Sequence, residues 1–283
     1  MSHVEKEIVE GVFKLWPEVE KSLREFYEEY EDFPKKELED FYREIRFYLL
    51  YMDHISRLRE RGLSFCYPVF GDEGPIEVES LYDLILAKRL LKEGKEVVPN
   101  DLHLKVGERT VIITGPNGGG KTTFLRSLGI AQIMAQSGIF VPARSFKTVL
   151  YRGIFSHFRG DEDERTGKLE EELRRMRDIV DELSGSDLIL MNESFSSTSE
   201  RKGSEIANQI VRALKDSGEG IVYVTHLTTF TKSICSNDDT LCLKAERLKD
   251  GTRTYKMIVS PPTDTSHAMD VFRRVFHLFP ETP

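Results

Sequence analysis

The chain has 283 residues, of which 31% are charged, and its formal net charge is −8. This charge gives no global positive field that would draw the chain to nucleic acid. No apolar run reaches the roughly 18 residues that a membrane span needs, and no secretory signal opens the sequence, so we expect a cytoplasmic protein without membrane contact. Cys66, Cys235 and Cys242 lack metal-ligand spacing, which favours reduced structural thiols.

The N-terminal region, residues 1–64, has the pattern of helices. Apolar side chains recur every three or four residues along Leu38–Ile55, which is the period of a helix with one buried face. A second helical stretch precedes it at Ile8–Tyr30, and Pro17 must kink or restart that helix. Turn residues at 32–34 separate the two stretches. We therefore predict a helical hairpin that packs on another surface.

Residues 65–283 alternate between short apolar runs and helical patterns. This alternation predicts an α/β fold with a mostly parallel sheet that helices cover on both faces. The charged run at 160–167 has no periodicity and is predicted to be a loop. The predicted strands are Thr110–Thr114, Asp187–Met191 and Gly220–Thr225, and the predicted helices are Gly120–Gln136, Leu169–Leu183 and Gly203–Lys215.

A complete phosphate-binding motif, G-x-x-x-x-G-K-T, connects the first of these strands to the first of these helices. Glycines let the loop wrap a polyphosphate with its N–H groups pointing inward, and the helix adds the positive end of its dipole. We expect Lys121 to reach the β- and γ-phosphates and the Thr122 hydroxyl to ligate Mg²⁺. The residues predicted to bind the nucleotide are Gly115, Pro116, Asn117, Gly118, Gly119, Gly120, Lys121, Thr122 and Thr123.

The second apolar strand ends in Asn192 and Glu193. A carboxylate at this position can orient or deprotonate the water that attacks the γ-phosphate, so we expect Glu193 to be catalytic. The alternative is that Glu193 has no catalytic role and is a solvated carboxylate at a strand end. Asn192 is the second predicted metal ligand, and because an amide lacks the negative charge of the usual Asp, we expect weaker Mg²⁺ binding.

The third apolar strand ends in Thr225 and His226. Ligands of parallel α/β sheets collect at the carboxyl ends of the strands. A lone histidine at such a place is more often structural. Because two other strand ends already carry predicted site residues, we expect His226 to bond the γ-phosphate or the attacking water.

Several segments resemble the MutS family of DNA mismatch-repair ATPases, a branch of the ABC-type ATPases. Gly115–Phe124 is similar to the P-loop of that family, and the resemblance covers about residues 40–275 in order. It implies an ABC-type P-loop ATPase domain at 65–283, preceded by a lever-like remnant at 1–64. The other similar segments are Leu50–Asp53 and Pro68 (the end of the lever helices), Val98–Asp101 (the approach to the first strand), Ala131–Ala143 (the helix and turn after the P-loop), Asn192–Thr198 (Walker B and D-loop), Val224–His226 (the switch histidine) and Thr265–Ala268 (a late segment with serine).

The chain also departs from that family. It has no room for the mismatch-binding, connector and full clamp domains, so mismatch recognition does not carry over. The Gly-x-Ser-Thr signature that reaches the partner's nucleotide is replaced by Gly167–Leu173. Lys168 could serve the γ-phosphate in trans, but the glutamates at 170–172 would repel a nucleotide. The acid usual at position 192 is absent.

The resemblance implies a homodimer that closes over two nucleotides, with Ser196, Ser197 and Thr198 at the interface. The leading hypothesis is an ATPase of low rate that uses ATP, ADP and Mg²⁺ as a mechanical switch in DNA repair or another DNA transaction. An alternative is a sensor that binds ATP with little or no hydrolysis, which Asn192 favours. A P-loop kinase or nucleotide transferase is a third hypothesis.

The sequence does not decide whether the chain binds DNA directly. Arg144, Lys147 and Arg152 form a thin basic cluster, which is more typical of a solvated face than of a phosphate-binding surface. The bulk charge adds no argument for it.

Overall fold

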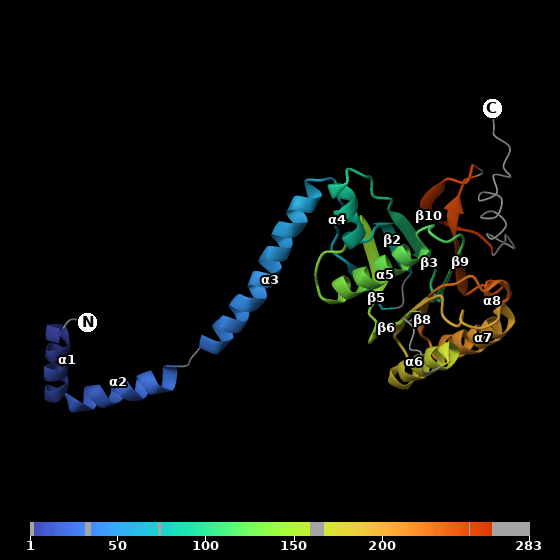
Figure 1. Ribbon diagram of the computed structural model, residues 1–283. Coiled ribbons are helices and arrows are strands. Elements are labelled where there is room, and N and C mark those ends of the chain that lie inside the picture. The colour runs from blue at the N-terminus through green and yellow to red at the C-terminus, as the bar shows by residue number, and fades with distance from the viewer. Residues whose placement is uncertain (1–2, 32–34, 73–74, 159–166, 249, 262–283) are drawn as a thin grey trace. The chain divides into compact units, whose positions relative to one another are not determined.

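The computed structural model divides into two compact units, Met1–Glu60 and Arg61–Pro283 (Figure 1). The predicted domain boundary between residues 64 and 65 stays a prediction. The structure describes residues 3–31, 35–72, 75–158, 167–248 and 250–261.

The first unit contains the helices α1 (His3–Leu15), α2 (Pro17–Tyr30) and α3 (Lys35–Arg59). Pro17 begins α2, where the missing N–H removes no helical bond, so the proline restarts the helix as predicted. No residue of α1 or α2 is buried. The predicted turn at 32–34 lies outside the described residues, and the packing of these helices as a hairpin stays a prediction.

No described helix of the chain is both long enough and apolar enough to cross a membrane.

A six-stranded sheet organises the second unit, with the strand order β10-β9-β4-β8-β7-β6. Neighbouring strands are parallel except for β10, which pairs with β9 in the antiparallel sense. The prediction of an α/β fold is thus confirmed. The strands are β4 (Thr110–Thr114), β6 (Ile154–Phe158), β7 (Leu188–Asn192), β8 (Gly220–Val224), β9 (Thr240–Arg247) and β10 (Arg253–Val259).

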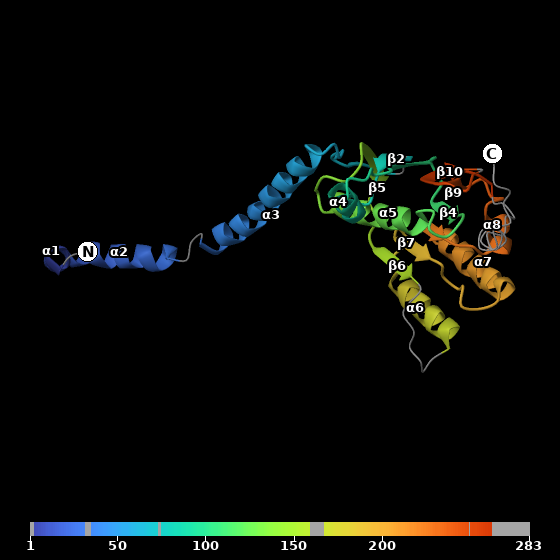
Figure 2. The same ribbon diagram turned by 45° about the horizontal axis from the view of Figure 1, so that its top comes forward.

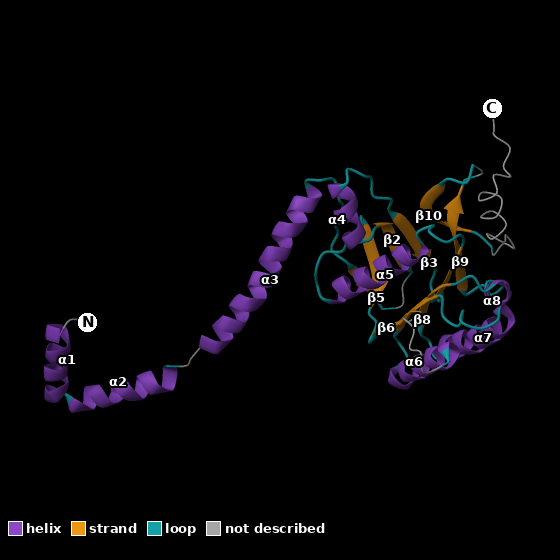
Figure 3. Ribbon diagram, in the orientation of Figure 1, coloured by secondary structure: helices purple, strands orange, loops and turns teal. Residues whose placement is uncertain are grey.

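Helices α6 (Lys168–Glu182), α7 (Glu200–Asp216) and α8 (Thr228–Ile234) cover one face of this sheet. Alternate residues of a strand point to opposite faces, and one set, including Ile189 of β7 and Tyr223 of β8, packs on these helices. Figures 1 and 2 show α6 and α7 on this side and helix α5 (Lys121–Gln136) on the other. Figure 3 colours the helices purple and the strands orange, which separates the helical layers from the sheets.

A smaller sheet, which the sequence analysis did not predict, lies over the other face with the order β1-β5-β2-β3. Its β2–β3 and β2–β5 pairs are antiparallel, and its β1–β5 pair is parallel. Helix α4 connects β2 to the loop before β3. The bounds of these elements are Val69–Gly71 for β1, Ile76–Leu81 for β2, Leu84–Lys92 for α4, Asn100–Leu104 for β3 and Ser145–Val149 for β5.

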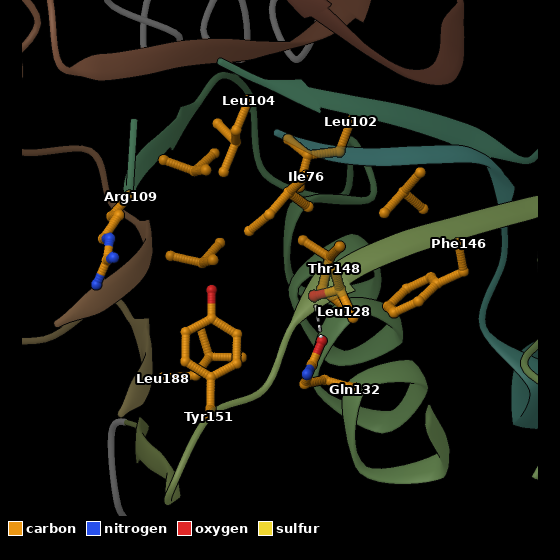
Figure 4. Close-up of a pocket in the computed structure, with 13 residues that line it drawn as sticks. Ile76, Leu102, Leu104, Arg109, Leu128, Gln132, Phe146, Thr148, Tyr151 and Leu188 are labelled. Carbon is orange, nitrogen blue, oxygen red and sulfur yellow. Dashed lines mark hydrogen bonds between the residues drawn. The ribbon is translucent and has the colours of Figure 1, made fainter. Parts of the chain in front are cut away.

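The two sheets and α5 meet around a small apolar cavity of about 30 Å³ (Figure 4). Leu188 and Val222 reach it from the large sheet, and Leu102 reaches it from the small sheet. The Thr148 hydroxyl donates a hydrogen bond to Gln132 Oε1 of α5 at 2.8 Å, which ties the small sheet to that helix. This packing fixes α5, whose first residues belong to the predicted phosphate site.

The prediction of reduced thiols is wrong for two of the three cysteines. Cys235, the residue after α8, and Cys242 of β9 form a disulfide, with their Cα atoms 6.0 Å apart. This separation lies within the ordinary range for disulfides. Cys66 is not part of a disulfide. Cys242 lies on β9 level with Ile112 of β4, and the spacing of the cysteines alone does not reveal the disulfide.

Candidate functional site

The carboxyl ends of three neighbouring strands bring the predicted site residues together. Strand β8 lies between β4 and β7, and its Val224 is level with both Ile113 and Asn192. The loop after β4, the Asn192–Glu193 pair and the residues after β8 therefore leave the sheet at the same edge. Parallel α/β sheets bind ligands at this edge.

The loop that follows β4 is closely packed and leads directly into α5. Gly120 precedes the helix with φ of 92°, a left-handed conformation that glycine adopts without strain. A Cβ atom at Gly115 would lie 2.9 Å from the backbone nitrogen of Ala245, and one at Gly119 would lie 2.9 Å from its Cβ. The backbone N–H of Gly119 donates to Pro116 O at 3.2 Å. The glycines of the motif thus permit contact between the loop and β9.

Lys121 is the buried cation of this loop, with 5% of its surface exposed. Its ammonium group donates to Gly115 O at 2.8 Å, to Pro116 O at 3.2 Å and to Asn117 Oδ1 at 3.4 Å. Burial lowers the pKa of Lys121, and the charge of Glu193 partly opposes that shift. The ammonium group thus lies inside the loop, within reach of any anion that the loop encloses.

The two predicted metal ligands are in direct contact. The Thr122 hydroxyl donates a hydrogen bond to Asn192 Oδ1 at 2.9 Å. Both groups present oxygen atoms, which Mg²⁺ prefers, but neither carries a charge. Among the described residues, no group of three or more His, Cys, Asp or Glu side chains is arranged to hold a metal. The pair fits an ion that also takes oxygens from a phosphate and from water.

Glu193 and His226, which the sequence analysis predicted separately as catalytic residues, also meet in the structure. Glu193 Oε2 lies 2.5 Å from His226 Nδ1, without the alignment of a hydrogen bond. The Glu193 side chain is 20% exposed and that of His226 is 60% exposed. The carboxylate is thus largely sheltered, while the imidazole faces solvent.

The backbone at Glu193 has a φ of 54°, which is unusual for a residue with a side chain. Three hydrogen bonds hold the turn. The Glu193 N–H donates to Val224 O at 2.8 Å, the Ser196 hydroxyl donates to Glu193 O at 2.6 Å, and the Tyr223 hydroxyl donates to Ser194 O at 2.5 Å. Strained backbone of this kind persists where the surroundings fix it, and it is common at functional sites.

A buried histidine of β6, His157, contacts the same turn and was missed by the sequence analysis. His157 Nδ1 lies 2.6 Å from the Ser194 hydroxyl, and His157 Nε2 lies 2.9 Å from Glu172 O. Burial lowers the pKa of His157, which fits a neutral ring that donates through Nε2 and accepts through Nδ1. The sequence signal for it is weak, because His157 lies on a short strand without a motif.

Glu200, the first residue of α7, connects the turn to the segment after His226. Its carboxylate accepts hydrogen bonds from the Thr229 N–H at 2.9 Å and from the Thr228 hydroxyl at 3.1 Å. The hydrogen bond from the Thr229 backbone is the largest cause that lowers the pKa of Glu200. The N-terminus of α8 is thereby fixed to the residues that follow Glu193.

A cavity of about 590 Å³ lies beside the loop, within the size range of small-molecule sites. Gly118, Gly120 and Thr123 line one side of it, and Tyr255 of β10 lines another. Tyr255 is a second residue that the sequence analysis missed, because it lies far from the loop in the sequence. The ring of Tyr255 offers an apolar surface to a ligand that the loop holds.

Glutamates of Gly167–Leu173, the segment that stands in place of the signature, have partners within the chain. Glu170 pairs with Arg174 at 2.6 Å, and Glu172 is buried and accepts a hydrogen bond from Ser197 at 3.1 Å. These contacts weaken the repulsion that the sequence analysis expected from the three glutamates.

Two comparisons with known proteins agree on the family. The family model of MutS domain V matches residues 111–280. The chain is 31% identical to the endonuclease MutS2 of Clostridium kluyveri over 226 residues, which cover 76% of the chain and 28% of that relative. It is 29% identical to the protein of the same name from Lactiplantibacillus plantarum, with 67% of the chain and 24% of the relative covered. For that from Listeria monocytogenes the identity is 30%, with 68% and 25% covered.

The chain therefore spans about a quarter of the length of these relatives. The late segment that resembles the family, Thr265–Ala268, lies within the matched range but outside the described residues. Because the family model matches more than half of the 283 residues, the chain belongs to the MutS family.

Proposed function

We propose that residues 65–283 form a MutS-type ABC ATPase domain that binds ATP with Mg²⁺ and hydrolyses ATP at a low rate. The observation that carries this proposal is the meeting of Lys121, Asn192–Glu193 and His226 at one edge of the sheet. The membership of the MutS family supports it. A mostly parallel sheet with a smaller, largely antiparallel sheet beside the loop is also consistent with an ABC-type domain.

Binding of the polyphosphate falls to the loop and to Lys121. The backbone N–H groups of residues 117–120 and the N-terminus of α5 provide partial positive charge for an anion. Lys121 exchanges its carbonyl acceptors, Gly115 O and Pro116 O, for phosphate oxygens when the nucleotide enters. The cavity beside Tyr255 accommodates the base.

Thr122 and Asn192 hold the metal ion in this proposal. When bound, Mg²⁺ neutralises part of the phosphate charge and thereby favours attack by water. Because the amide of Asn192 is neutral, the protein contributes less charge to the ion than an aspartate would.

Glu193 accepts the proton of the attacking water, or orients that water, and is the general base of the reaction. Its short contact with His226 places a second polar group at the same point. His226 donates a hydrogen bond to the γ-phosphate or to the water. The hydrogen bonds around Ser194 and Ser196 keep the Glu193 carboxylate at the sheet edge.

Steady-state release of phosphate from ATP, measured with Mg²⁺ at neutral pH, tests this function directly. We expect turnover above the rate without protein and below the roughly 1 to 100 per second typical of kinases. Tight ATP binding without any turnover would instead favour the sensor hypothesis, which Asn192 and the absent Ser-Thr signature support. Failure to bind ATP at all would refute both.

We further propose that two copies close over two nucleotides, with Ser196–Thr198 at the interface. Ser196 and Ser197 donate hydrogen bonds within their own chain, to Glu193 O and Glu172, so closure acts on the turn that carries Glu193. Sedimentation at micromolar concentration should show a shift from monomer toward dimer when ATP is added to the Glu193→Gln variant, in which ATP persists. A strict monomer with and without ATP would contradict the proposed dimer.

A role in DNA repair or in another DNA transaction rests on the family alone. In the basic cluster of the sequence analysis, Arg144 pairs with Glu79 at 3.2 Å and Lys147 pairs with Glu77 at 3.3 Å. These ion pairs reduce the positive field of that face, so we do not assign DNA contact to it.

A further inference from the structure

Strand β10 runs beside the phosphate-binding loop and is firmly placed there. The Asn100 side-chain amide donates to Tyr255 O at 3.0 Å, and the Met257 N–H donates to Asn100 Oδ1 at 2.7 Å. A Cβ atom at Gly120 would lie 3.6 Å from Met257 Cε and 3.7 Å from Tyr255 Cδ1. The same strand begins at Arg253, which extends its contact to the middle of the loop.

The guanidinium group of Arg253 occupies the space that a side chain at Gly118 would fill. A Cβ atom there would lie 2.7 Å from Arg253 Nη1 and 3.1 Å from Cζ. Gly118 also has a φ of 72°, in the region that favours glycine. The cation therefore lies against the loop because residue 118 has no side chain.

Arg253 differs from the other cations near the loop in having no partner among the described residues. Lys121 donates to the loop carbonyls, Arg126 pairs with Asp83 at 2.6 Å, and Lys256 donates to Pro99 O. An unpaired guanidinium in contact with Gly118 is a ready partner for the oxygens of a phosphate that the loop holds, because they match its planar pair of donors.

The balance of charge around the loop points the same way. Asn192 is neutral where a carboxylate would bind and attract the metal ion, and Arg253 adds a positive charge at Gly118. A site with fewer carboxylates and an added cation favours the bare polyphosphate over its metal complex. The neutral Asn192 and the charge of Arg253 thus both reduce the dependence of nucleotide binding on Mg²⁺.

We propose that Arg253 binds the polyphosphate of the nucleotide from within the same chain and allows the site to hold ATP with little help from Mg²⁺. This inference rests on the proposed function, because it assumes that the loop binds ATP. Arg253 is a binding residue supplied by the edge strand, and it is separate from the residues that the motif of the loop predicts.

Calorimetric titration of the full chain with ATP and with adenosine, each with Mg²⁺ and with EDTA, tests the proposal. For the wild type we expect removal of Mg²⁺ to weaken ATP binding less than about tenfold. For Arg253→Ala we expect a loss of about tenfold with Mg²⁺ and roughly 100-fold in EDTA, since a charged hydrogen bond is lost. Adenosine binding should not change, because adenosine carries no phosphate.

Arg253→Lys keeps the charge without the planar pair of donors and should fall between wild type and Arg253→Ala. Arg144→Ala is the matched control, because it removes an arginine just before β5 that pairs with Glu79 of the small sheet. Equal ATP affinities for wild type and Arg253→Ala in EDTA would overturn the inference while leaving the proposed function intact. A wild type that binds no ATP under either condition would overturn both.

Discussion

Replacement of Lys121 by alanine should weaken ATP binding by roughly 100-fold or more, since the loop loses the charged donor it directs at the phosphates. Lys121 is the buried cation of the loop, and its ammonium group already lies within hydrogen-bond distance of Gly115 O and Pro116 O. The backbone N–H groups and the helix dipole remain in the variant, so ATP should still bind in the loop, with lower affinity. Isothermal titration with ATP and ADP measures the loss.

The matched control for this variant is Lys105→Ala, which removes an exposed lysine whose nearest carboxylate is Glu108 at 3.9 Å. We expect wild-type ATP affinity for it. Because Lys121 also bonds to the loop, the thermal unfolding midpoint of both variants must be compared with that of the wild type. A folded Lys121→Ala variant with wild-type ATP affinity would contradict the assignment of the loop.

Three strands of the large sheet, β4, β7 and β8, were predictable because they carry their signal locally, whereas β6, β9 and β10 were not predicted. Thr110–Thr114 is a run of β-branched residues between a turn and a glycine-rich loop, and it forms β4 at those bounds. The predicted strands at 187–191 and 220–225 correspond to β7 and β8 within one residue. Their carboxyl ends meet because parallel strands share one edge, so the meeting of the site residues also followed from the sequence.

The small sheet was not predictable, since it depends on pairing between distant segments. Strand β2 pairs with β5, whose residues follow the glycine-rich loop and α5 in the sequence. Its pattern also breaks at Ser80, which has a φ of 54° and lies where the register with β3 shifts. Tyr255 and Arg253 escaped notice for the same reason, since β10 reaches the loop only through its pairing with β9.

Replacement of Glu193 by glutamine should leave ATP binding within a few-fold of wild type and reduce the hydrolysis rate by about 100-fold to 10,000-fold, the usual contribution of a general base. Glutamine keeps the shape of the side chain, so the turn held by Val224 O and by Ser196 should persist. It cannot accept a proton from water at neutral pH. Single-turnover hydrolysis of bound ATP separates this chemical step from nucleotide binding.

Glu205→Gln is the control, because Glu205 pairs with Arg201 on the exposed side of α7 and should leave the rate unchanged. A Glu193→Gln variant that hydrolyses ATP at the wild-type rate would remove Glu193 from the mechanism. If wild type and variant are equally slow while both bind ATP tightly, the protein is a sensor. In that case the neutral amide of Asn192, which contacts Thr122, becomes the physical reason for the missing turnover, and Asn192→Asp is the change that should restore it.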